Sequence, residues 1–291
     1  MIENYLLEEL VTFAQTGTLA KTAAALNVTQ PTITRGMQKL EADWDVQLFV
    51  RQPNHLSLTP TGQLAVKEAA ALLTATQQAV ERVRNFERSQ YICTLATSIP
   101  GPLIVLRNIH SQLPTNTRLP PQSVPESQLI TGLKANDYSL VFSNHPLSTE
   151  TIDSQYIGTE RLAVNLNQFM FQANQTTITF AELKGLSFVV LNDIGPWRKI
   201  IQANIPNANF FYQEQRTALT EITKYADFPY FSTNISGFDE TLPQQDTAND
   251  SRVCLPISDS AGQMPIYALY RHTERNRVQP IISQLIAVWP K

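Results

Sequence analysis

The chain has 291 residues, with 22 basic and 25 acidic side chains and 43% hydrophobic residues against 16% charged. This length suggests two to three domains, and the low charge content excludes a self-repelling disordered chain. Two cysteines cannot form a stapling disulfide framework, and 10 glycines exclude a fibrous repeat. No window approaches the run of about 18 uncharged apolar residues that a membrane span needs.

The first ten residues, MIENYLLEEL, place acidic side chains where a secretory signal peptide needs a basic region and a long apolar core. We therefore expect a cytoplasmic protein with no membrane partner and with reduced thiols. Cys93 and Cys254 fall in apolar runs, so both are predicted to be buried packing residues and not a redox switch. The sequence carries no basic tail, so any binding of DNA must come from a local arrangement of residues.

Residues 1–58 are predicted to form an all-α winged helix-turn-helix domain. Apolar side chains recur at the spacing of amphipathic helices, and Thr18 and Thr29 stand where N-cap hydroxyls would begin the second and third helices. Pro31 follows in the first turn of the third helix, where its missing N–H costs nothing. In chain order the pattern predicts a helix that Gly17 ends, a helix over 19–26, a helix over 30–42, and a wing of two short strands over 48–59 around the turn 52–55.

The third helix has one apolar and one polar side. Ile33, Met37 and Leu40 share a stripe that would pack on the first two helices, which leaves the opposite side free to enter a DNA groove. On that side Arg35 can donate two hydrogen bonds to guanine, worth about 1–3 kcal/mol of discrimination. The alternative is that these residues only form the solvated side of a helix and a polar turn. The residues predicted to contact double-stranded DNA are Thr18, Thr29, Gln30, Pro31, Thr32, Thr34, Arg35, Gln38, Lys39, Arg51, Asn54 and His55.

The charge of this domain predicts weak nonspecific binding. Residues 1–60 carry four basic and six acidic side chains, so one chain can neutralise few phosphates. We therefore expect two or four such domains to bind together.

Residues 59–89 predict a linker helix of roughly 45 Å, because Thr59 and Pro60 form a helix start and no Gly or Pro follows Gly62. An apolar seam recurs along it in steps of four and three, which is typical of a coiled coil. One small domain cannot bury so long a seam, so the expected partner is the same helix in a homodimer or homotetramer. The alternative is packing on its own chain. The predicted dimerisation residues are Ala65, Ala69, Leu72, Ala79, Val83 and Phe86.

Residues 90–291 alternate short strand-like and helical runs, which favours a parallel α/β architecture of two lobes. Lobe I is expected at about 90–162 and 266–291, and lobe II at about 163–265. Strands are predicted over 91–96, 139–142, 162–166, 188–191, 228–232 and 266–270. Helices are predicted over 102–113, 127–135, 180–184, 196–203, 217–225 and 277–288, and a surface loop over 239–251.

Polar residues end several of these predicted strands, at the edge where parallel α/β lobes bind small molecules. The turn at Thr97 and Ser98, before a helix, suits a carboxylate; Trp197 would form an apolar wall, and Arg198 would neutralise an anion. The alternative is that each of these residues caps a helix or a turn. The predicted effector contacts are Thr97, Ser98, Ser143, Asn144, Asn192, Trp197, Arg198, Ser232 and Thr233.

Enzymatic function finds little support in the sequence. The four histidines have no metal-binding spacing such as HExxH, and neither a GxSxG motif nor a phosphate loop is present. We therefore assign no catalytic residue, metal ligand or cofactor, apart from a small-molecule effector of unknown identity. A solute-binding protein would share the third segment but not the first.

An ordered set of residues over 17–62 resembles the LysR-type transcriptional regulators. The resemblance implies a sequence-specific regulator that binds DNA, self-associates through its linker helix, and carries an effector domain similar to type II periplasmic binding proteins; a regulator with a filled cleft is the alternative. Asp45 stands where the family usually has Gly, at a position that favours a left-handed backbone, and Gly36 interrupts the recognition helix. The matching residues are Gly17-Thr18-Leu19, Ala23-Ala24, Leu26, Thr29-Gln30-Pro31, Thr34, Leu40-Glu41, Leu48-Phe49, Arg51 and Leu58-Thr59-Pro60-Thr61-Gly62, with Glu182–Leu191 matching further on.

Overall fold

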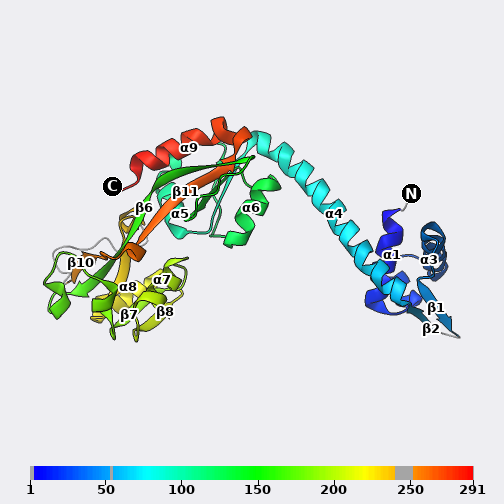
Figure 1. Ribbon diagram of the computed structural model, residues 1–291, viewed down its shortest axis with the longest axis horizontal. Coiled ribbons are helices and arrows are strands. Elements are labelled where there is room, and N and C mark those ends of the chain that lie inside the picture. The colour runs from blue at the N-terminus through cyan, green and yellow to red at the C-terminus, as the bar shows by residue number, and fades with distance from the viewer. Residues whose placement is uncertain (1–2, 53–54, 240–251, 291) are drawn as a thin grey trace. The chain divides into compact units, whose positions relative to one another are not determined.

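The computed structural model describes residues 3–52, 55–239 and 252–290 (Figure 1). The chain divides into two compact units, Met1–Arg84 and Asn85–Lys291, and the division falls inside the long helix α4 (Pro60–Tyr91). Two predictions lie outside the described residues: the loop over 239–251, apart from Asp239, and Asn54 in the turn of the wing.

The first unit has the predicted helix-turn-helix and wing. The hydroxyl of Thr18 accepts a hydrogen bond from the N–H of Lys21 at 3.3 Å, and that of Thr29 accepts from the N–H of Thr32 at 3.4 Å, so both predicted N-caps are present. Asp45 ends the third helix with a φ of 53°, in the left-handed conformation expected there. The elements are α1 (Asn4–Thr16), α2 (Leu19–Ala25), α3 (Gln30–Trp44), β1 (Phe49–Gln52), β2 (His55–Leu58) and the first part of α4.

The core of this unit lies between α1, α3 and the wing. Ile33, Met37 and Leu40 are buried, as their spacing predicted, and pack with the apolar side of α1. The rings of Phe13 and Phe49 meet edge to face, with centroids 5.4 Å apart, and so join α1 to the wing.

The predicted apolar seam along α4 has a buried first part and an exposed second part. Ala65 and Ala69 are buried in the core of the first unit, so the prediction that they face a second chain is wrong. Farther along α4, Leu72, Val83 and Phe86 are 50%, 71% and 57% exposed, and Ala79 is exposed as well. Only this second part of the seam remains available to a partner.

The second unit is a mixed sheet covered by helices. Its strands lie in the order β4-β3-β5-β11-β6-β9-β7-β8, with β10 also paired to β6. The strands are β3 (Cys93–Thr97), β4 (Thr117–Arg118), β5 (Leu140–Ser143), β6 (Ile152–Asn167), β7 (Ser187–Leu191), β8 (Asn209–Gln213), β9 (Tyr230–Thr233), β10 (Arg252–Pro256) and β11 (Gln263–Arg271). The α-helices are α5 (Pro100–Asn108), α6 (Glu126–Lys134), α7 (Trp197–Asn204), α8 (Arg216–Tyr225) and α9 (Arg275–Val288).

The expectation of a parallel architecture is right at both ends of this sheet and wrong in its middle. Strands β4, β3 and β5 are parallel, as are β9, β7 and β8, whereas β6 and β11 are antiparallel to each other and to their other neighbours. The chain runs in one direction along β6 and in the opposite direction along β11, and these two strands are hydrogen-bonded neighbours, so they form an antiparallel pair. Figure 1 shows these two long strands next to each other.

Strand β6 changes partners along its length. Residues up to Arg161 pair with β11, and residues from Leu162 onward pair with β9 and β10.

The predicted helix over 180–184 is a 3-10 turn, Phe180–Leu183, held by a capping box between Thr179 and Glu182. The short strands β4, β8 and β10 were not predicted.

The two cysteines differ in burial. Cys93 is buried in the main core, and burial raises the pKa of its thiol to about 11, which agrees with a packing role. Cys254 is exposed on β10, so the prediction that it is buried is wrong. Among the described residues, no helix is both long enough and apolar enough to span a membrane.

Candidate nucleic-acid interface and ligand cavity

The side of α3 opposite its buried stripe is open. We call Gln30, Pro31, Arg35 and Gln38 the reading face; all four side chains are exposed. The side chains of Gln30, Arg35 and Gln38 make no hydrogen bond to the described part of the protein, so their donors and acceptors are free for another molecule. Thr34, at its edge, is half-buried.

The threonine hydroxyls around the reading face are engaged locally. The Oγ1 atoms of Thr29 and Thr32 lie 2.9 Å apart, and Thr34 donates its hydroxyl to the carbonyl oxygen of Gln30 at 3.1 Å. These contacts fix the first turn of α3, which orients the side chains that follow it.

The predicted DNA-binding cations fall into two groups. The ammonium group of Lys39 lies 2.8 Å from the Glu3 carboxylate, and the Arg51 guanidinium lies 3.0 Å from that of Glu41. Arg35 has no such partner among the described residues. Of the two cations on α3, Arg35 is therefore the one whose charge no described residue compensates.

Glu41 was not predicted as a site residue, yet it holds the wing on α3. Its Oε1 atom accepts hydrogen bonds from the N–H groups of Leu48 and Phe49 at 2.8 and 3.0 Å, and its Oε2 atom accepts from Arg51. The sequence contained a signal for it, because Leu40-Glu41 belongs to the LysR-like set of residues. Its position shows that Glu41 orients the wing and does not face a ligand.

A hollow of about 480 Å³ lies between the start of α2, α3 and the wing. It brings together Thr18, Gln30, Thr34 and Arg51, four residues that were predicted to contact DNA. His55 begins β2, and its side chain lies outside the described part of the chain.

Gly36 allows α1 to approach α3 closely. A Cβ atom at this position would lie 1.8 Å from Oε2 of Glu9, a buried side chain of α1. Burial raises the pKa of the Glu9 carboxyl group.

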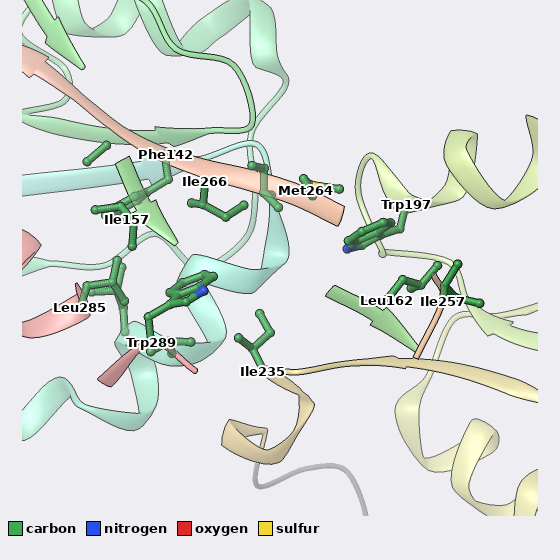
Figure 2. Close-up of a cluster of buried hydrophobic side chains, with 14 of the residues drawn as sticks. Phe142, Ile157, Leu162, Trp197, Ile235, Ile257, Met264, Ile266, Leu285 and Trp289 are labelled. Carbon is green, nitrogen blue, oxygen red and sulfur yellow. The ribbon is translucent and has the colours of Figure 1, made fainter. Parts of the chain in front are cut away.

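The second unit contains a cavity of about 120 Å³. The first turn of α5, strands β6, β7 and β9, and helix α7 all contribute to its walls. Of the predicted effector contacts, Trp197, Ser232 and Thr233 line it. Figure 2 shows the Trp197 ring extending from its helix toward Met264.

The other predicted effector contacts lie outside the lining of this cavity, and two of them, Thr97 and Ser143, make the turn contacts of the alternative interpretation. The hydroxyl of Thr97 donates to the carbonyl oxygen of Ile99 and accepts from its N–H, at 2.7 and 3.0 Å. Ser143 accepts from the N–H of His145 at 3.1 Å. Ser98 is partly buried and its Oγ atom has no hydrogen-bond partner in the described chain, while Asn144 is half-buried.

The side chain of Arg198 is exposed and does not line the cavity. Its Nη1 atom donates to Oδ1 of Asn192 at 2.7 Å, and its guanidinium lies 4.1 Å from the centre of the Tyr212 ring. Arg198 and Asn192, which were both predicted to contact an effector, therefore bind each other. The guanidinium that was expected to neutralise an anion lies outside the lining of the cavity.

Glu160 is the cavity residue that the sequence analysis missed. It is 4% exposed, and burial raises the pKa of its carboxyl group to about 7, while nearby Trp197 and Thr233 act in the opposite direction. The signal was the period of two along β6, since Leu162, Val164 and Leu166 are buried and Glu160 precedes them on the same face.

The chain was compared with known proteins and structures. Residues 5–63 match a family profile described as "Bacterial regulatory helix-turn-helix protein, lysR family". HcaR of Escherichia coli (strain K12), an Hca operon transcriptional activator, is 24% identical over 291 residues, which cover 97% of this chain and 95% of HcaR. The transcriptional regulator TcbR of Pseudomonas sp. (strain P51) is 30% identical over 148 residues, which cover 48% of this chain and 50% of TcbR.

Two solved structures share the fold. DarR of Vibrio fischeri, solved in complex with DNA, has a TM-score of 0.61 at 16% identity and covers 98% of this chain and 99% of its own. A full-length OxyR variant from Pseudomonas aeruginosa has a TM-score of 0.52 at 16% identity and covers 99% of this chain and 95% of its own. HcaR is described as a transcriptional activator and TcbR as a transcriptional regulator. With an open helix-turn-helix that matches the lysR profile and relatives that regulate transcription, the chain belongs to the LysR family of DNA-binding transcriptional regulators.

Proposed function

We propose that the reading face of α3 enters the major groove of the target DNA, with Arg35 as the principal reader of a base. The observation that carries this assignment is that Arg35 is exposed and uncompensated, whereas Lys39 and Arg51 are paired with carboxylates of the same unit. A guanidinium with free donors can bind O6 and N7 of guanine together. Lys39 and Arg51 then serve the phosphate backbone, where a paired cation still supplies donors.

We infer three further parts of the mechanism. Residues 1–58 bind DNA in the cytoplasm, 59–89 join subunits through the exposed part of the α4 seam, and 90–291 bind a small effector. The change of partners along β6 supports lobes that meet near residue 162. An effector with different affinities for two arrangements of the oligomer would change the spacing of the DNA-binding units, and so transcription.

The test uses the full-length chain and a duplex selected by it from a randomised pool. Arg35→Ala is expected to weaken binding to this duplex by about 1–3 kcal/mol, roughly 5- to 150-fold, and to relax the preference at one base pair. Arg118→Ala is the matched control, because Arg118 is an exposed arginine on β4 in the other unit. Unchanged affinity and sequence preference in the Arg35 variant would show that the assignment of the reading face is wrong.

A further inference from the structure

The cavity of the second unit has an unusual charge balance for a site that would hold an organic anion. Glu160, Asp193 and Asp239 line it, whereas none of the described residues that line it is Lys, Arg or His. An anion that leaves water needs an opposite charge or several donors to offset its desolvation. This lining supplies three carboxyl groups, and the serine and threonine hydroxyls of Ser232, Thr233 and Ser236 carry no charge that would balance an anion.

The helix N-terminus that would attract an anion already faces a carboxyl group of the protein. A Cβ atom at Gly101, in the first turn of α5, would lie 2.5 Å from Oε2 of Glu160. The side chain of Glu160 therefore packs directly against this turn, where amide groups and the helix dipole favour negative charge. Above its pKa of about 7 the Glu160 carboxyl group is ionised, and an anionic ligand there would meet its charge.

Two buried polar atoms of the lining lie near each other without forming a hydrogen bond of ordinary geometry. They are Oε2 of Glu160 and Nε1 of Trp197, and neither has a hydrogen bond of that geometry to the described part of the protein. The side chains of Trp197 and Thr233 are both near enough to lower the pKa of the Glu160 carboxyl group. One atom is an acceptor and the other is a donor, and a hydroxyl group can satisfy both at once.

Most of the remaining wall is apolar, Ser232, Thr233 and Ser236 add hydroxyl groups to it, and the space is small. Ile104, Leu162, Ile194, Leu219 and Phe231 contribute to it. Its volume of about 120 Å³ is close to that of the cavity of about 150 Å³ that holds a benzene molecule in another protein. The space therefore suits a single ring.

From these observations we propose that the effector of this protein is a small, uncharged, ring-sized molecule with a hydroxyl group, which accepts from Nε1 of Trp197 and donates to Glu160, and that organic anions are excluded. The inference rests on the proposed effector function of residues 90–291 and names the chemical class of ligand for that site.

The test measures thermal stabilisation of the full-length chain by phenol, benzoate and benzylamine, which share a ring and differ in charge. At pH 8 the Glu160 carboxyl group, with its pKa of about 7, is mostly ionised. Phenol is expected to raise the melting temperature to a plateau, and benzoate is expected to have no effect. Equal or stronger stabilisation by benzoate or benzylamine overturns the proposal, and so does the absence of any shift with all three probes.

Two variants test the assigned contacts. Trp197→Phe keeps a ring but removes the N–H, and should weaken phenol binding about fivefold to tenfold. Glu160→Gln keeps an acceptor, removes the charge and adds a donor, and should admit benzoate. Glu150→Gln, at an exposed position outside the cavity, is the matched control and should change neither result. Unchanged phenol binding in the Trp197 variant, or continued exclusion of benzoate by the Glu160 variant, overturns the assignment.

A circular dichroism spectrum of each preparation shows whether a variant is folded. The DNA-binding assay separates the two hypotheses. A failure of the reading-face assignment appears as unchanged DNA affinity in Arg35→Ala, whereas a failure of the ligand assignment appears only in the melting temperatures.

Discussion

The attachment of the wing to α3 depends on one carboxylate, which makes a graded test possible. Both N–H groups that Glu41 accepts, from Leu48 and Phe49, bind its Oε1 atom, while Arg51 binds Oε2. Replacing Glu41 by Ala removes all three bonds. Replacing it by Gln keeps Oε1 for the two N–H groups and removes only the acceptor for Arg51.

The free energy that holds the wing in place is expected to fall several-fold more in Glu41→Ala than in Glu41→Gln. Leu48 and Phe49 are fully buried, so Glu41→Ala leaves two buried N–H groups without partners, at about 1–3 kcal/mol each, and we expect about 3 kcal/mol in all. The Arg51 side chain is 52% exposed. An ion pair of this kind contributes below about 1 kcal/mol, so Glu41→Gln and Arg51→Ala should each cost less than that.

Hydrogen exchange of the amides in the β1–β2 ladder, measured in the full-length chain, reports the free energy of opening the wing. Glu41→Ala should speed this exchange about 150-fold, and Glu41→Gln less than fivefold. Amides of α9 in the second unit serve as the internal control and should not change. If Glu41→Gln and Glu41→Ala accelerate exchange equally, the charge holds the wing and the two N–H bonds do not.

Three further predictions concern other parts of the chain. Asp45 has a left-handed backbone, so Asp45→Gly should stabilise the first unit by about 0.5–1 kcal/mol in urea unfolding; a loss of stability would reveal an unrecognised contact of the aspartate. Because the folded state raises the pKa of Glu160 from 4.5 to about 7, it binds this proton more tightly than the unfolded state, and stability should fall by about 3 kcal/mol as pH rises through this interval. Glu160→Gln should abolish this part of the pH dependence of unfolding, and an identical slope in both proteins would contradict the burial argument. Val83→Asp should reduce the mass of the oligomer in light scattering, whereas Gln77→Asp on another side of α4 should not; an unchanged mass in the Val83 variant would show that the seam is not the interface.

The helix-turn-helix was predictable because its signals are local. The hydroxyls of Thr18 and Thr29 lie three residues from the N–H groups they accept, and the buried stripe of α3 follows from helical spacing alone. The left-handed conformation of Asp45 was expected from the resemblance to the LysR-type regulators, which usually have Gly at this position. The helices of the first unit and the buried stripe of α3 could therefore be derived from short stretches of sequence.

The cavity could not be predicted from short stretches of sequence, because segments far apart in the chain form its walls. Glu160 on β6 lies against the first turn of α5 and near Trp197 of α7 only in the folded chain. Nothing near Glu160 in the sequence predicts these two contacts. Arg198 was expected to meet an anion, yet Asn192 and Tyr212 lie within its reach.

The sequence by itself determined that α4 is one long helix with an apolar seam, because periodicity and the absence of Gly and Pro act along the chain. The tertiary structure decided that Ala69 is buried and Val83 exposed, although both occupy the same seam. The physical reason is that burial depends on which other element lies against a side chain, and that is a property of the whole fold.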